Sequence, residues 1–371
     1  MLKQLLAPFV ILVGISFPWS AGQVHAQDPI PELDPVRIIK VFKHQSETLS
    51  LSKDGKRLAV VGEDIEESLG KSLVRVIDLK SAKTLQEFPA ESGGIIPVAY
   101  SPDGKQLAFG GGQIGVVNSQ TGRPQGRLER ATGGGISETQ LEFSPDGKFI
   151  WTFDFETVVG FDAKSLREVR TFPTKGRRVC AIGMLPTRKM LAVGYNNGGV
   201  RLYPPGTKKE KEIVLDPGSD DEPKPTDIAH RKPLKFAETV DGKWLVVSRF
   251  DLNLELWDLD AKEKIREFSP AAMRVDAMEI LGGNRVLVAL GKWVTPRGDR
   301  DFNKKSQPLI VFDMNSGKAV AYLKIQDQRD NSFNVWSMQA SADDELLYVA
   351  TENGSVQVFD VSRWSTASSE K

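Results

Sequence analysis

The sequence predicts an all-β protein, a seven-bladed β-propeller that is closed by its N-terminal strand. The first observation is a recurring segment, clearest as SPDGKQLAFG at residues 101–110 and SPDGKFIWTF at residues 144–153. Successive copies are about 42 to about 60 residues apart, and a propeller blade takes roughly 40–50 residues. Such a repeat is typical of an architecture in which each unit packs against its neighbours. Looser copies begin at residues 52, 185, 240, 281 and 341.

The second observation is the pattern inside each copy, which indicates four short strands. In one clear copy, LEFS at residues 141–144 precedes the turn and the apolar run FIWTF follows it. A second alternating run, VVGFD at residues 158–162, ends in an acid, and a last run, REVRTF, ends at Phe172. Alternating apolar and polar residues, with Gly, Asp and Asn between the runs, are typical of antiparallel strands. Four strands per copy make one blade.

The third observation concerns the two ends of the repeat array. The last copy stops after VQVFDVSRW at residues 356–364, one strand short of the others. The run VRIIKVF at residues 36–42 precedes the first turn and ends in Phe, as several of the other fourth strands do. We therefore expect this N-terminal strand to complete the last blade and close the ring. Closure also removes an unpaired strand edge, which would favour aggregation.

The N-terminus carries the features of a signal peptide. Lys3 precedes an apolar run, which ends in the small-residue cleavage pattern Val24-His25-Ala26. The run is too short for a comfortable membrane span, so we expect no span after signal cleavage. The protein should then be exported, to the periplasm or out of the cell. The expected segments are a signal peptide at 1–26, a short linker at 27–35, the propeller at 36–364 and a polar tail at 365–371.

Charge and composition narrow the range of functions. The chain has 49 basic and 49 acidic residues, so it lacks the basic excess of a general nucleic-acid-binding protein. It has one cysteine, so an internal disulfide cannot form and the fold must depend on its hydrophobic core. We expect a monomer that does not bind nucleic acid.

The fifth copy carries residues that resemble the WD-repeat family of propellers. Its Trp257-Asp258 is the only WD dipeptide in the chain. The family places a His–Ser–Trp–Asp hydrogen-bond network in its blades, and the resemblance implies a structural role for the matching residues. A catalytic role for the histidine is the alternative. The SPDGK turns are also similar to the repeats of periplasmic TolB-like propellers, which implies the same fold. The matching network positions are His230, Ser248, Asp251 and Trp257.

No catalytic, cofactor-binding or metal-binding motif is present in the sequence. Of three histidines one lies in the signal peptide, and with a single cysteine no zinc site of the usual ligand spacing can be written. The nucleophile elbow, the phosphate-binding loop and the HExxH motif are also absent. We therefore expect a non-enzymatic protein without cofactor or metal. The alternative is a propeller enzyme, lactonase-like or another hydrolase, that acts on a small substrate in the central channel.

The longest connections between the expected strands indicate a working face. Loops from the second to the third strand, and from the fourth strand to the next blade, should open on one rim. The opposite rim should carry only tight turns. Binding residues are often found on loops that a rigid scaffold presents. Long connections are expected at residues 63–72, 130–138, 217–232, 292–308 and 326–334.

The loop at residues 292–308 has the composition of a protein-binding surface. It mixes aromatic and basic side chains, and Trp and Arg are the residue types that most often anchor interfaces. We therefore expect a protein-interaction or scaffold module that binds a protein partner through this rim. The candidate contact residues are Trp293, Arg297, Arg300 and Phe302.

Overall fold

A computed structural model shows an all-β protein. Among the described residues, the regular structure consists of β-strands and one short 3-10 helix, η1 (Ser362–Trp364). None of the helical structure described is long and apolar enough to cross a membrane. The structure describes residues 30–64, 71–91, 96–129, 140–154, 156–174, 176–204, 212–218, 233–250, 254–268, 273–282, 285–293, 309–326 and 335–364.

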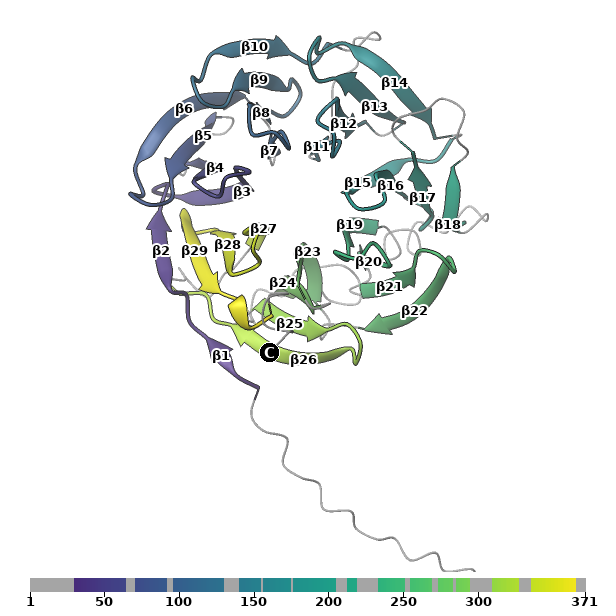
Figure 1. Cartoon of the computed structure of the whole chain (residues 1–371). Coiled ribbons are helices and arrows are strands. Elements are labelled where there is room, and N and C mark those ends of the chain that lie inside the picture. The colour runs from purple at the N-terminus through teal and green to yellow at the C-terminus, as the bar shows by residue number, and fades with distance from the viewer. Residues whose placement is uncertain are drawn as a thin grey trace, which may run out of the picture.

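Seven small sheets stand around a central axis and form a seven-bladed β-propeller (Figure 1), as the sequence predicts. In each blade the first strand lies nearest the axis and the last strand lies at the outside of the ring (Figure 1). Blade 1 contains β3 (Gln45–Leu51), β4 (Arg57–Glu63), β5 (Lys71–Asp78) and β6 (Thr84–Glu91). Blade 2 contains β7 (Val98–Tyr100), β8 (Gln106–Phe109), β9 (Gly115–Asn118) and β10 (Pro124–Arg127). Blade 3 contains β11 (Glu142–Phe143), β12 (Phe149–Phe153), β13 (Thr157–Asp162) and β14 (Glu168–Pro173).

The remaining blades follow in chain order, and the last two also contain strands from the N-terminus. Blade 4 contains β15 (Val179–Leu185), β16 (Met190–Tyr195), β17 (Val200–Tyr203) and β18 (Ile213–Asp216). Blade 5 contains β19 (Pro233–Glu238), β20 (Trp244–Arg249), β21 (Leu254–Asp258) and β22 (Glu263–Phe268). Blade 6 contains β23 (Met273–Leu281), β24 (Arg285–Trp293), β25 (Leu309–Asp313), β26 (Lys318–Leu323) and β1 (Glu32–Leu33). Blade 7 contains β27 (Val335–Ala340), β28 (Leu346–Thr351), β29 (Ser355–Asp360) and β2 (Arg37–Lys40).

The turn between the first and second strands has the same hydrogen bonds in five blades, which explains the recurring SPDGK segment. In blade 2, Ser101 Oγ and Lys105 N both donate to Asp103 Oδ1, at 2.7 and 3.0 Å. Gln106 N donates to Ser101 Oγ at 2.9 Å. Gly104 has a φ of 72°, a left-handed conformation that glycine adopts without steric cost. The equivalent pairs are Ser52 and Asp54, Ser144 and Asp146, Thr239 and Asp241, and Ser341 and Asp343.

The turns between the third and fourth strands also share one plan in blades 1, 2, 3, 5 and 6. In blade 6, Ser316 N and Oγ donate to Asp313 Oδ1 at 2.8 and 2.9 Å. Gly317 has a φ of 69° and ends the turn, and the register of β25 and β26 then shifts by a β-bulge. This geometry explains why the third run of so many copies ends in an acid or amide: the side chain caps the turn that follows.

The N-terminal strand closes the ring, as predicted. β2 pairs antiparallel with β29, with Arg37 opposite Val358 and Lys40 opposite Ser355. It therefore supplies the fourth strand of blade 7, whose other strands come from the C-terminal end of the chain. The first and last parts of the propeller are thus held together by backbone hydrogen bonds.

Phe42, which follows β2, anchors this closure. Its side chain is 1% exposed and the guanidinium of Arg75 lies over its ring at 4.6 Å. Val41 N and Phe42 N both donate to Gly354 O, at 3.0 and 2.8 Å. A Cβ on Gly62 would lie 2.5 Å from the Phe42 ring, so glycine is required at position 62 for this packing. The closing segment is therefore fixed by packing on blade 1 as well as by pairing in blade 7.

A second N-terminal strand lies in the segment that was expected to be a linker. β1 pairs parallel with β26 at the outer edge of blade 6, with Glu32 opposite Tyr322 and Leu33 opposite Leu323. Two residues are too few to show an alternating pattern, so the sequence does not predict this strand. Residues 30–42 therefore fasten to blade 6 and to blade 7 in succession (Figure 1).

The apolar core lies between neighbouring blades. At the junction of blades 3 and 4, the Trp151 ring stacks on Phe172 at 5.2 Å between ring centroids, and Phe172 stacks on Tyr203 at 4.5 Å. Gly160 lies beneath Trp151, because a Cβ there would approach the indole ring to 2.6 Å. Each blade is stable only with its neighbours in place, which makes closure of the ring important for the whole fold.

Candidate functional site

The binding rim predicted from the sequence falls mainly outside the described residues. Arg297, Arg300 and Phe302 belong to residues 294–308, which the structure does not describe. Trp293 was expected in a loop, but it is the last residue of β24, where its backbone pairs with Met273. The reason is the length of this hairpin. β23 and β24 have 9 residues each, so their pairing continues beyond the point expected from the shorter strands of the other blades.

Strand direction decides on which rim each connection lies. In a four-stranded antiparallel blade, the second-to-third connection and the connection to the next blade share one rim. The ends of β24 and β25 that flank residues 294–308 therefore lie on the same rim as the ends of β18 and β19 that flank residues 217–232. The opposite rim was expected to carry only tight turns, and this is wrong in blade 4. There residues 204–212 connect the third and fourth strands, since β17 ends before Pro204, which cannot donate to a strand ladder.

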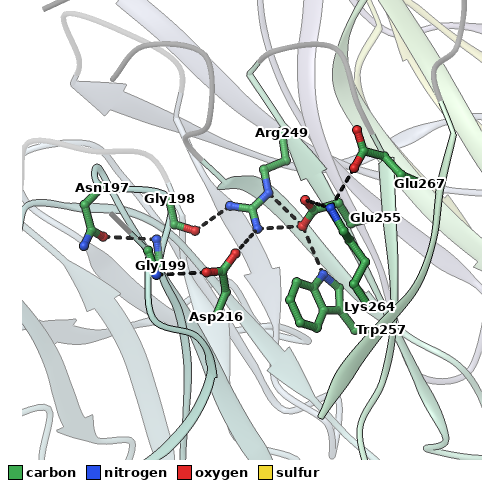
Figure 2. A network of polar contacts seen from close by, with 10 residues as sticks. Asn197, Gly198, Gly199, Asp216, Arg249, Glu255, Trp257, Lys264 and Glu267 are labelled. Carbon is green, nitrogen blue, oxygen red and sulfur yellow. Dashed lines mark hydrogen bonds and ion pairs between the residues drawn. The ribbon is translucent and has the colours of Figure 1, made fainter. Parts of the chain in front are cut away.

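A buried network of charged side chains joins blades 4 and 5 (Figure 2). Arg249, the last residue of β20, is 1% exposed. Its guanidinium donates to Glu255 Oε2 on β21 at 2.6 and 2.8 Å and to Asp216 Oδ2 at the end of β18 at 2.8 Å. It also donates to the backbone oxygen of Gly198 at 2.5 Å. A buried charge requires this kind of pairing and hydrogen bonding.

Glu255 is the centre of the network on the side of blade 5. Its Oε2 also accepts from Trp257 Nε1 at 3.0 Å, and Lys264 Nζ lies 3.3 Å from Oε1. Burial opposes ionisation of Glu255, but the charge of Arg249 and the hydrogen bonds from Arg249 and Trp257 outweigh it and hold its pKa below the ordinary value. Each charge has an opposite partner, which indicates a structural role.

This network differs from the one expected from the WD-repeat resemblance. His230 and Asp251 lie outside the described residues. Trp257 donates to Glu255, and Ser248 Oγ, although buried, has no hydrogen-bond partner in the described part of the chain. A carboxylate is a stronger acceptor than a hydroxyl, and Glu255 lies two residues from Trp257 on the same face of β21. Trp257 is therefore bonded to Glu255, a residue that the resemblance does not include.

The inner edges of the blades face the axis, where their backbone N–H groups have no neighbouring strand. Side chains from the preceding blade accept hydrogen bonds from several of these N–H groups. Leu51 N donates to Gln339 Oε1 at 2.8 Å, and Ile182 N donates to Gln140 Oε1 at 2.7 Å. Polar residues near the axis therefore satisfy the backbone and link the blades. The other pairs are Leu49 N with Ser337 Oγ, Tyr100 N with Ser50 Oγ, and Ala340 N with Glu279 Oε1.

Two carboxyl groups near the axis form the described arrangement best suited to chemistry. Glu142 is on β11 and Glu279 is on β23, on opposite sides of the axis (Figure 1). Burial raises the pKa of Glu142 to about 7, although the charge of Lys235 on β19 opposes it. Burial raises the pKa of Glu279 to about 8, and the charges of Asp344 and Glu142 add to the effect. One carboxyl therefore disfavours ionisation of the other, so a proton is held near the axis at neutral pH.

These carboxyl groups do not make a metal site with other described side chains. Within the described ranges, no group of three or more His, Cys, Asp or Glu side chains could hold a metal ion. Glu142 accepts no hydrogen bond from the residues that the structure describes, and Glu279 accepts the Ala340 N–H at 3.3 Å. Both carboxyls titrate close to neutral pH, which is the range that acid–base chemistry requires.

The sequence pattern singled out none of these charged residues. Glu142 and Glu255 occupy polar positions in alternating runs, which predict side chains that face solvent. Glu255 is buried because both faces of β21 are covered by neighbouring blades, and Glu142 belongs to β11, the strand of blade 3 nearest the axis. Arg249 alone could have been noticed in the sequence, because this charged residue continues the strand that is formed by the apolar run WLVV and Ser248.

The raised pKa values predict that stability falls as the pH rises. In the unfolded chain these carboxyls titrate near 4.5, and in the fold Glu142 titrates near 7 and Glu279 near 8. The folded state thus binds more protons between these values, so stability is greatest below the window and falls as the pH rises through it. Each pKa unit corresponds to about 1.4 kcal/mol, so the loss should be on the order of 3–5 kcal/mol per carboxyl. We expect Glu279→Gln to raise Tm at pH 8.5 and to leave it unchanged at pH 4, as measured by calorimetry.

Two controls test this interpretation. Glu156→Gln removes an exposed carboxyl and should leave the pH dependence as it is in the parent protein. Hydrogen bonds from Ser101 and Lys105 lower the pKa of Asp103, a representative of the turn aspartates. These aspartates therefore change the stability at a lower pH than Glu142 and Glu279 do. If Glu142→Gln and Glu279→Gln both leave the dependence of Tm on pH unaltered, the carboxyl pair is not its cause.

Comparisons with known proteins leave the family open. No protein-family model matches this sequence, and a search of curated proteins found no match. The propeller fold therefore rests on the sequence repeat and on the arrangement of the seven sheets.

Proposed function

We propose that this protein is an exported, WD-repeat-like propeller that serves as a scaffold for a protein partner. The closed ring is the observation that carries the proposal. β2 joins the first and last blades, β1 fastens the N-terminal segment to blade 6, and the Arg249 network ties blade 4 to blade 5. A rigid ring holds its loops in fixed relative positions, which is the property that a binding scaffold requires.

The partner is proposed to bind the rim that carries residues 217–232 and 294–308. These connections are far longer than a strand reversal needs, and the strand ends that flank them lie on one rim. The second includes Arg297, Arg300 and Phe302 and directly follows Trp293. Aromatic and arginine side chains contribute most of the energy in many interfaces, and these four are the proposed anchors.

Replacing Trp293 and Arg297 with alanine is expected to weaken the complex strongly. Loss of two anchors should cost on the order of 2 kcal/mol or more, about a 30-fold rise in Kd. The partner would be captured from the native envelope fraction with the tagged protein and identified by mass spectrometry. Its Kd would then be measured for the parent protein and the double variant.

The matched control is Arg123→Ala, which removes an exposed arginine from a tight turn on the opposite rim. It should leave the Kd unchanged. If Arg123→Ala weakens the complex and the rim variant does not, the wrong rim has been chosen. A large fall in Tm for Trp293→Ala would show that this residue belongs to the core, since surface substitutions usually stay within about 0.5 kcal/mol.

A second candidate function uses the axis of the ring. Glu142 on β11 and Glu279 on β23 both have raised pKa values, and carboxyls with such shifts occur in acid–base catalysis. A hydrolase acting on a small substrate, the alternative expected from the sequence, would place that substrate between them. Glu142→Gln and Glu279→Gln would each abolish such an activity, and neither would affect partner binding at the rim.

A further inference from the structure

The outer edge of blade 6 already binds an extended segment of this chain. Tyr322 N donates to Pro31 O at 2.9 Å, and Lys324 N donates to Leu33 O at 2.8 Å. The added strand runs parallel to β26, so β1 forms a fifth strand of the sheet. Strand addition at an exposed sheet edge is a common way to recognise extended peptides.

Side chains of the same segment make contacts that would give selectivity. Leu33 packs against the apolar cluster between blades 6 and 7, which includes Leu323 and Trp364. Asp34 Oδ1 accepts a hydrogen bond from Gln326 Nε2 at 3.1 Å. The edge therefore offers backbone groups, an apolar contact for a leucine, and an amide donor for the acid that follows it.

Charge also favours an acidic segment at this edge. Lys318 and Lys324 are exposed, one at the start of β26 and the other just after its end. The segment that occupies the edge has acidic residues on both sides of Leu33, at Glu32 and Asp34. Opposite charges across an interface steer association and fix its register.

The present occupant is short. β26 has 6 residues, and β1 pairs with only the last two of them. β2, by comparison, pairs with β29 through 4 residues. Segments with few backbone hydrogen bonds open at low free-energy cost, so β1 can leave the edge without opening the ring. A longer strand could pair with more of β26.

We propose that the outer edge of blade 6 is a strand-addition site for an extended acidic segment of a protein partner, and that β1 occupies it in the free protein. The partner segment would carry the pattern Pro-Glu-Leu-Asp, with its leucine in the place of Leu33. This site rests on the proposed scaffold function but is separate from the rim around Trp293. β1 then acts as an internal competitor that limits binding to partners with a better strand.

The experiment uses the full chain and a labelled peptide with the sequence of residues 28–36. Leu33→Asp should release β1, because a carboxylate cannot pack in the apolar cluster. Hydrogen exchange at the amides of Tyr322 and Lys324, which β1 protects, should then become at least tenfold faster. Adding the peptide should restore protection, and fluorescence anisotropy should show at least tenfold tighter peptide binding to the variant than to the parent protein.

The controls make each outcome decisive. Asp34→Ala removes only the hydrogen bond from Gln326. It should also speed exchange and tighten peptide binding, with a smaller effect than Leu33→Asp. It therefore tests the proposal even if Leu33→Asp does not fold. A peptide carrying aspartate in place of leucine should not bind. Unchanged exchange at Tyr322 and Lys324, or equal binding of the two peptides, would overturn the proposal. A dimeric variant would assign the edge to a second copy instead. Partner binding at the rim, measured with Trp293→Ala, is independent of all these results.

Discussion

Deletion of residues 36–42 is expected to prevent formation of the closed ring. The deletion removes β2, so β29 becomes an unpaired edge in blade 7. It also removes Phe42, whose buried ring packs between the closing segment and blade 1. Loss of a buried phenylalanine alone costs about 3–5 kcal/mol, and a typical domain has a total stability of about 5–15 kcal/mol. The truncated chain should aggregate or melt far below the parent protein, as measured by soluble yield and circular dichroism.

A pair of point variants separates the strand from its anchor. Phe42→Ala keeps the backbone of β2 and should destabilise the fold by about 3–5 kcal/mol in urea denaturation. Val36→Ala changes a side chain that is 61% exposed just before β2 and should stay within about 0.5 kcal/mol of the parent. A deletion variant that melts at the same temperature as the intact chain would refute the closing role of this strand.

Arg249→Ala is expected to be the most damaging single substitution of a charged residue in the described structure. It would leave the carboxylates of Asp216 and Glu255 buried without the cation that both contact. Removing one member of a buried ion pair costs about 3–5 kcal/mol, because the remaining charge stays desolvated. The loss should appear in the urea midpoint.

Two comparisons test whether the burial of Arg249 and its partners causes this loss of stability. Lys148→Ala removes an exposed ion pair with Asp146 and should cost less than about 1 kcal/mol. The double variant Arg249→Leu with Glu255→Leu removes the cation and one of its two buried carboxylates, so it should recover part of the loss, because apolar residues can replace a buried pair. If Arg249→Ala costs no more than Lys148→Ala, the network does not hold blades 4 and 5 together.

The repeat and its turns could be predicted from the sequence because their causes are local. The Ser–Asp–Gly turn needs a hydroxyl, a carboxylate and a residue with positive φ within a few positions, and all three are visible in the text of residues 101–105. The closing strand was also predictable, because one copy lacks a fourth run and residues 36–42 supply it. Both predictions depend on a pattern that recurs in the copies of the repeat.

The candidate sites were harder to predict because their contacts join blades far apart in the chain. Glu279 and Glu142 lie on different blades, and only closure of the ring brings them to the same axis. Ser248 and Trp257 have the expected spacing, yet Trp257 bonds to Glu255 instead. Residue spacing alone does not tell which acceptor a buried donor will meet.

The sequence by itself determined the all-β class, the seven blades, the shared turns and the closing strand, because each follows from a pattern that is repeated along the chain. Only the tertiary structure decided that Arg249 is buried between two blades, that the strand pairing of β24 extends to Trp293, and that β1 lies on blade 6. The physical reason is the same in these cases. Burial and pairing depend on which surfaces meet when the ring closes, and a periodic sequence pattern specifies each blade but not the individual contacts between blades.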